Sequence, residues 1–98
     1  MPASQFRLTA AARHDLIEIG RYTAAKWGRT QRNLYLMQLD RAFALLAENP
    51  MLGQPCNDLQ PGYRKFQQGS HLIYYRLTDL VEVIRILHQG MDPEFHLT

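Results

Sequence analysis

The segment GSHLIYYRLTDLVEVIRILHQGMD, residues 69–92, contains two nearly continuous apolar runs joined by a short polar stretch. β-Branched and aromatic residues dominate both runs, which favours strands over residues 71–77 and 81–88. The dipeptide TD between them has the right length for a hairpin turn. Arginine interrupts each run, at Arg76 and Arg85, and a histidine stands near an end of each. The sequence therefore places cations within an apolar antiparallel sheet.

Two further strands extend this sheet. Residues 63–67 form a strand candidate that the turn-like sequence QQGS connects to the next run, which gives a three-stranded antiparallel meander. Residues 5–8, QFRL, alternate polar and apolar side chains and predict a short strand that joins the meander. Between these strands lie the helical patterns and a loop over residues 49–62, which holds three of the five prolines.

The first helix is predicted from residue 10 to Trp27. Thr9 is suited to the N-cap, because its hydroxyl can accept from an orphan N–H of the first turn, and three alanines follow it. Gly28 is suited to the left-handed position that ends a helix. One apolar stripe should face the core, and we expect Trp27 to pack there as its last member. The stripe consists of Ala12, Leu16, Ile19, Thr23 and Trp27.

A second helix follows almost at once, with Thr30 as its expected cap and Pro50 as its stop signal. Its apolar stripe is formed by Tyr35, Leu39, Ala42, Phe43 and Leu46. So short a link makes an antiparallel helical hairpin. The predicted fold class is α+β: an N-terminal strand and a helical hairpin packed on a small antiparallel β-sheet.

Composition indicates one ordinary globular domain spanning residues 1–98, with 46% hydrophobic and 20% charged residues. A net charge of +2 permits a nucleic-acid partner without arguing for one. Cys56 is the only cysteine, so no internal disulfide can form, and a reducing cytoplasm is expected. Neither a signal peptide nor a membrane-spanning stretch is expected.

The last strand predicts a sheet that is apolar on both faces. Strict alternation puts Val81, Val83, Arg85 and Leu87 on one face and Glu82, Ile84, Ile86 and His88 on the other. A single helical hairpin can cover only one of these faces. The second face is then covered either by another polypeptide or by the loop at residues 49–62, and the pattern leaves both alternatives open.

The chemistry-bearing residues give no metal or nucleophile pattern. The four histidines are scattered, no phosphate-binding glycine loop is present, and helical carboxylates such as Asp15 are expected on solvated faces. We therefore expect no cofactor and no metal. The remaining candidate is a cationic group on the sheet with tyrosines interleaved. Its members are Arg64, Lys65, Arg76, Arg85, His71 and His88, with Tyr63, Tyr74 and Tyr75.

Three roles are open to these cations. They could stabilise the transition state of a metal-independent ribonuclease, with His or Tyr moving protons. They could instead pair with acidic side chains of a protein partner. Alternatively, Arg76 and Arg85 could pair with acids of the same chain, such as Glu82, Asp79, Asp92 or Glu94, and simply satisfy the fold.

Four motifs carry a resemblance to a known family: DLIEIGRYTAAKWG, LLAENPMLG, GYRKFQQGSHLIYYR and VIRILHQGMD. In this order and spacing they resemble the ParE toxins of bacterial type II toxin–antitoxin systems, within the RelE/ParE superfamily. The resemblance runs from Phe6 to Leu97. It implies a helical hairpin against an antiparallel sheet, and a ParD-type antitoxin whose C-terminal segment covers the toxin's groove in a hetero-oligomer.

The resemblance also implies an activity. ParE-like toxins are understood to bind DNA gyrase and trap its cleaved-DNA intermediate, so association with DNA would be indirect and the toxin would not be an enzyme. The sister activity is the ribosome-dependent mRNA cleavage of RelE-like toxins, which depends on basic residues on the sheet together with an arginine and a tyrosine or histidine in the segment after the last strand. Here that segment, QGMDPEFHLT, has no Arg, Lys or Tyr, and only His96 could serve. An inactive antitoxin-binding module is the third reading.

The expected target-facing or antitoxin-contacting groups are Arg64, Lys65, Arg85 and His88, with Tyr74 and Arg76 behind them. No catalytic residue is expected among them.

Overall fold

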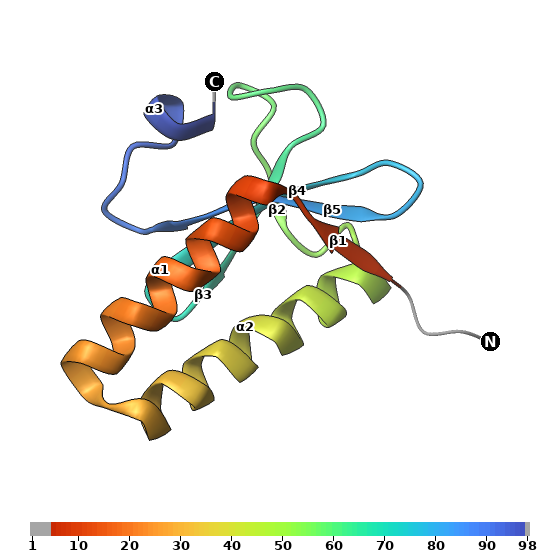
Figure 1. The fold of residues 1–98 in the computed structure, drawn as a ribbon. Coiled ribbons are helices and arrows are strands. Elements are labelled where there is room, and N and C mark those ends of the chain that lie inside the picture. Colours follow the sequence, from red (N-terminus) through yellow and green to blue (C-terminus); the bar gives the residue numbers. More distant parts are fainter. Residues whose placement is uncertain (1–4, 98) are drawn as a thin grey trace.

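The computed structural model describes residues 5–97. The elements in chain order are β1 Phe6–Leu8, α1 Ala10–Trp27, α2 Arg29–Glu48, β2 Gln54–Pro55, β3 Arg64–Gln68, β4 His71–Leu77, β5 Val81–His88 and α3 Pro93–Leu97. The two long helices form a hairpin on one side of the sheet, and α3 lies with the loop between β2 and β3 on the other side (Figure 1). The predicted α+β fold with its helical hairpin is confirmed.

The strands form one five-stranded sheet in the order β1-β5-β4-β3-β2. The predicted meander of β3, β4 and β5 is present and antiparallel. β1 joins it beside β5, but in the parallel sense, so the sheet is mixed rather than purely antiparallel. The short strand β2 was not predicted. It pairs with only the first two residues of β3.

Thr9 and Gly28 set the ends of α1. The Thr9 hydroxyl accepts from the Ala12 N–H at 3.0 Å, as predicted, and donates to the Ile84 carbonyl at 2.7 Å, which ties the helix start to β5. Gly28 has a φ of +91° and ends the helix, also as predicted. The same glycine precedes Arg29, the first residue of α2. The prediction that Thr30 caps α2 is therefore wrong, because one residue makes the whole turn.

The main core lies between the helical hairpin and the sheet, with Ala12 and Ile19 as the contribution of α1. Leu39, Phe43 and Leu46 are fully buried against the sheet residues Ile73 and Tyr75. Burial of each such apolar side chain contributes roughly 1.5–3 kcal/mol. All three α2 residues belong to the predicted stripe. The spacing of apolar residues therefore identified the packed face of α2 correctly.

The prediction that Trp27 packs in the core is wrong, because the residue is 64% exposed. The buried stripe of α1 ends at Thr23. Beyond it the hairpin extends past the sheet, so the last turn of α1 has no layer to pack against (Figure 1). Helical periodicity shows which direction a side chain takes but not where the opposing surface ends.

Strict alternation along β5 fails at Ile84. The register pairs Tyr74 with Arg85 and Tyr75 with Val83, which leaves Ile84 as an extra residue between them. Such a bulge reverses the facing of every later side chain. Val83 and Ile86 therefore both lie in the helix-facing core. The predicted division of β5 into two faces is wrong from this point on.

The second face of the sheet, opposite the helical hairpin, is covered by the chain itself around Tyr74. Cys56, Tyr74 and Leu87 form a second buried cluster, and each is at most 5% exposed. The residues packed against this cluster are Leu59, Tyr63, Leu72 and Leu97. Internal cover by the 49–62 loop was one of the two open alternatives, and the structure confirms it here. The contribution of α3, through Leu97, was not predicted.

Candidate functional site

Arg85 is held by a buried carboxylate of α1. Its Nε and Nη2 atoms donate to Asp15 Oδ2 and Oδ1, both at 2.8 Å, and its Nη1 donates to the His96 carbonyl at 3.0 Å. The Ile86 N–H also donates to Asp15 Oδ2, at 2.9 Å. The hydrogen bonds that Arg85 donates to Asp15 raise the pKa of the Arg85 guanidinium. A bidentate pair of this kind orients Arg85 firmly.

The role of Asp15 was not predicted. The prediction that Asp15 lies on a solvated helix face is wrong, because the residue is 9% exposed. β1 pairs with only the first three residues of β5, so the N–H of Ile86 faces α1 instead of a strand. An acceptor is needed there, because a buried unpaired N–H is costly. The sequence around Asp15 does not indicate that its partners, Arg85 and Ile86, lie 70 and 71 residues further along the chain.

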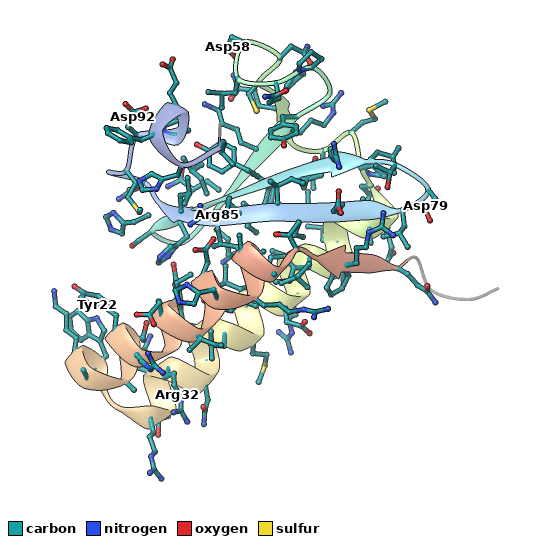
Figure 2. All side chains as sticks on the ribbon, turned by 45° about the horizontal axis from the view of Figure 1, so that its top comes forward. Tyr22, Arg32, Asp58, Asp79, Arg85 and Asp92 are labelled. Atoms are coloured by element: carbon teal, nitrogen blue, oxygen red, sulfur yellow. The ribbon has the colours of Figure 1, made fainter. Side chains whose placement is uncertain are left out.

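Arg76 lies at the opposite end of the sheet, in an exposed ion-pair network. Glu82 accepts from Arg76 at 2.9 Å and from Arg7 at 3.4 Å, and Arg7 also pairs with Asp79 at 3.2 Å. The hydrogen bond from Arg76 is the main cause that lowers the pKa of Glu82. The expected internal pairing of Arg76 with Glu82 is therefore present. Figure 2 shows Asp79 at the turn between β4 and β5, well apart from Arg85.

Arg64 supports the segment that follows α2. Its Nη1 atom donates to the carbonyls of Gly53, at 2.5 Å, and Met51, at 3.3 Å. The paired residue Tyr75 donates to the Pro50 carbonyl at 2.7 Å and accepts from the Gly53 N–H at 2.8 Å. Arg64 therefore helps to hold the backbone of this loop in place.

Lys65, Tyr74 and Arg85 form one row across β3, β4 and β5, which we call the outer row. The register pairs Lys65 with Tyr74 and Tyr74 with Arg85. Tyr74 is 1% exposed and lies beneath the surface, and burial raises its pKa. Lys65 is half-buried and forms no ion pair with any residue between 5 and 97. Its ammonium is therefore free to meet a partner.

His88 lies on the helix-facing side, opposite His71 of β4. The two imidazole rings meet edge-on, with centroids 5.6 Å apart. His71 Nδ1 lies 2.6 Å from the Tyr35 hydroxyl, and His88 Nδ1 accepts from the Gly90 N–H at 3.1 Å. Burial, followed by the charge of His88, lowers the pKa of His71. His88 itself is exposed.

The structure therefore brings together three of the six predicted residues, Lys65, Tyr74 and Arg85, in the outer row. Arg64, Arg76 and His88 lie elsewhere, each with neighbours of its own. The part of the chain that the structure describes contains no group of three or more His, Cys, Asp or Glu side chains arranged to hold a metal ion. Across residues 5–97 no helix is both long and apolar enough to cross a bilayer.

A shallow groove on the helical hairpin was not predicted. It has a volume of about 640 Å³ and is lined by Leu16, Ile17, Gly20, Arg21, Ala24, Arg32, Asn33 and Leu36. Gly20 is buried where the helices meet, and a Cβ there would lie 3.5 Å from the Leu36 side chain. Ile17 is 54% exposed. Apolar residues outside the predicted stripe were the available signal.

Solved structures share this fold. The fold matches a chain of the chromosomal ParDE toxin–antitoxin system from P. aeruginosa with a TM-score of 0.74, over 88% of this chain and 96% of that one, at 18% identity. It also matches a chain of the toxin–antitoxin complex RelBE2 from Mycobacterium tuberculosis with a TM-score of 0.62, at 25% identity over 89% and 99% of the two chains. The fold is thus one found in toxin–antitoxin complexes.

Sequence comparison identifies the family. The sequence model of the family described as ParE toxin of type II toxin–antitoxin system, parDE, matches residues 6–93. Toxin ParE1 of Caulobacter vibrioides is 40% identical over 94% of this chain and 96% of its own length, and Toxin ParE1 of Mycobacterium tuberculosis is 40% identical over 97% and 99%. The chain belongs to the ParE toxin family of type II toxin–antitoxin systems. The predicted resemblance is confirmed.

Proposed function

We propose that this chain inhibits DNA gyrase by binding and trapping its cleaved-DNA complex, and that a ParD-type antitoxin neutralises it in a hetero-oligomer in the cytoplasm. The observation that carries the proposal is family membership across nearly the whole chain. Toxin and antitoxin occur together in the structural neighbours, which supports an antitoxin partner. Association with DNA is then indirect, through antitoxin and gyrase.

The chain acts by binding rather than by turnover in this proposal. A metal-independent nuclease needs cations that are free to stabilise a phosphorane. Arg76 and Arg85 are instead paired with Glu82 and Asp15, and Arg64 donates to loop carbonyls. The segment after β5 supplies no Arg, Lys or Tyr. These engagements favour a role as a binding protein.

The contact residues proposed for gyrase or antitoxin remain Arg64, Lys65, Arg85 and His88, with Tyr74 and Arg76 behind them. Lys65 and His88 are the strongest candidates for such a contact, because neither is paired with a carboxylate of the described chain and both are at least partly exposed. Arg85 has its guanidinium oriented by Asp15 and is also partly open to solvent. A charged partner would gain most from Lys65.

Gyrase supercoiling and cleavage assays with purified protein test the proposal. Inhibited supercoiling and accumulated cleaved DNA are expected. Lys65→Ala should weaken the inhibition about tenfold if it removes one buried charge contact worth 1.4 kcal/mol. Arg41→Ala, which removes an exposed arginine of α2, is the matched control and should have no effect.

Other outcomes would replace the proposal. Unimpaired gyrase at large molar excess of the toxin would contradict it. Cut mRNA in a mixture with translating ribosomes would instead assign the RelE-like activity. Normal growth of cells that express the chain without any antitoxin would favour an inactive antitoxin-binding module.

A further inference from the structure

The end of the helical hairpin carries exposed aromatic rings. Tyr22 is 61% exposed and Trp27 is 64% exposed, although both are large apolar side chains. Lys26 links them: its ammonium lies 5.6 Å from the Tyr22 ring centroid and 5.5 Å from the Trp27 centroid, and it donates to the Tyr22 hydroxyl at 3.2 Å. These three side chains form an ordered platform on the last turns of α1.

The same region is cationic and free of acids. Residues 19–39 contain no Asp or Glu, and they include Arg21, Lys26, Arg29 and Arg32. Arg21 is paired with Glu18 at 2.9 Å. The other three cations form no ion pair with any residue of the described range 5–97. We call Tyr22, Lys26, Trp27, Arg29 and Arg32 the hairpin tip.

The position of the tip leaves it accessible. Trp27 is the last residue of α1 and Arg29 the first of α2, so the tip is the turn of the hairpin, and it projects beyond the sheet (Figure 1). Figure 2 shows Tyr22 and Arg32 at this end, while the labelled acids Asp58, Asp79 and Asp92 lie around the sheet. The hairpin tip thus combines an excess of cations with two exposed aromatic rings, those of Tyr22 and Trp27.

Neither the exposed aromatic rings nor the unpaired cations of the hairpin tip contribute visibly to the fold. An exposed aromatic ring leaves apolar area in water, and unpaired like charges on one hairpin repel each other. Together they match the requirements of single-stranded nucleic acid, in which unpaired bases stack on aromatic rings and phosphates pair with cations. The rings favour this occupant over an acidic peptide, because carboxylates need only the cations.

We propose that the hairpin tip binds single-stranded nucleic acid, with bases stacked on Trp27 and Tyr22 and phosphates paired with Lys26, Arg29 and Arg32. This binding is a property of the free chain. It needs neither gyrase nor antitoxin, so it can fail or hold independently of the proposed function.

Binding of the full chain to fluorescein-labelled (dT)20 tests the proposal, measured by anisotropy at several salt concentrations. Trp27 is the only tryptophan in the chain, so its fluorescence reports directly on the tip and should be quenched as (dT)20 binds. With three phosphate contacts, log K should fall with log salt with a slope of about −2. A duplex of the same length should bind more weakly, because its bases are already stacked.

Three variants separate stacking from charge. Trp27→Leu should weaken binding about tenfold, in line with the contribution of base stacking. Arg29→Gln should weaken binding at low salt and reduce the magnitude of the salt slope by about 0.7. Arg41→Gln, which removes another exposed arginine of α2, should change neither. All three positions are exposed, so thermal unfolding should be unchanged and a folding defect would be recognised.

If neither the fluorescein anisotropy nor the Trp27 fluorescence changes when the chain and (dT)20 are mixed at low salt, the proposal is overturned. So would equal affinity for (dT)20 and a poly-glutamate peptide of matched charge, together with no effect of Trp27→Leu. That result would show that the tip is a site for acidic protein segments.

Discussion

Arg85 illustrates how one residue can look functional in the sequence and prove structural in part. It interrupts an apolar strand, and its guanidinium is paired with Asp15 in a geometry that also satisfies the Ile86 N–H. Removing one partner of a buried pair leaves an uncompensated charge, which usually costs more than the pair contributes. Any loss of function in an Arg85 variant must therefore be separated from a loss of stability.

Asp15→Ala should lower the free energy of unfolding by roughly 3 kcal/mol, because it removes the carboxylate that accepts from Arg85 Nε and Nη2 and from the Ile86 N–H. Urea denaturation followed by circular dichroism measures this change. Glu18→Ala is the control on the same helix. Its exposed pair with Arg21 should contribute less than about 1 kcal/mol. Equal losses in the two variants would mean that the Asp15 pair is no stronger than a surface pair.

His71 should make stability depend on pH. The charged and titratable groups that face it are Tyr35 from α2, His88 from β5 and Asp15 from α1. Burial lowers the pKa of His71 below its ordinary 6.5. As pH falls below about 6.5, the unfolded chain takes up a proton at His71 before the folded chain does. The free energy of unfolding should therefore decrease between pH 7.5 and 5.5.

His71→Gln should flatten this part of the pH profile, since glutamine keeps a polar side chain near Tyr35 but does not titrate. Urea denaturation at four pH values across the interval measures it. His14→Gln, which replaces an exposed histidine of α1, is the matched control for the loss of one histidine. An unchanged profile in the His71 variant would show that other groups cause the pH dependence.

At the scale of elements, the sequence predicted what depends on local pattern. Thr9, Gly28 and Pro50 marked helix ends, and the apolar stripe of α2 identified its buried face. The errors arose where distant segments decide the outcome. The extra residue in β5 coincides with the Thr9 hydroxyl bound to the Ile84 carbonyl, a contact between opposite ends of the chain. The alternation of side chains along β5 therefore could not predict the bulge.

The cover of the second face by α3 can be tested through Cys56. This thiol is 5% exposed, its pKa is raised by burial, and Leu97 packs against the cluster that contains it. Leu97→Ala should loosen this cover and increase the rate of Cys56 modification by a thiol reagent several-fold, because reaction requires local opening. Phe95→Ala changes an 83% exposed side chain of the same helix and should leave the rate unchanged. Equal rates in both variants would mean that α3 does not control access.

At the scale of the whole molecule, the candidate site could be predicted in composition but not in arrangement. The sequence correctly indicated cations on the sheet, and the register places Lys65, Tyr74 and Arg85 in one row. It could not indicate that Arg76 and His88 lie away from that row, since the bulge and the turns decide their facing. It also missed the hairpin groove and the exposure of Trp27, because both depend on where the sheet ends.

A ParD-type antitoxin should stabilise the whole chain by mass action, if the proposed partnership holds. A ligand that binds only the folded state, present at 100 times its Kd, adds about 2.7 kcal/mol. For a domain of this size the melting temperature should rise by roughly 10–20 °C. Differential scanning calorimetry with and without the antitoxin measures the shift.

Lys65→Glu should keep the melting temperature of the free toxin, since Lys65 forms no ion pair within residues 5–97. The antitoxin-induced shift should be smaller in this variant, because charge reversal opposes an acidic partner segment. An equal shift in the variant and the parent chain would place the antitoxin contact away from the outer row.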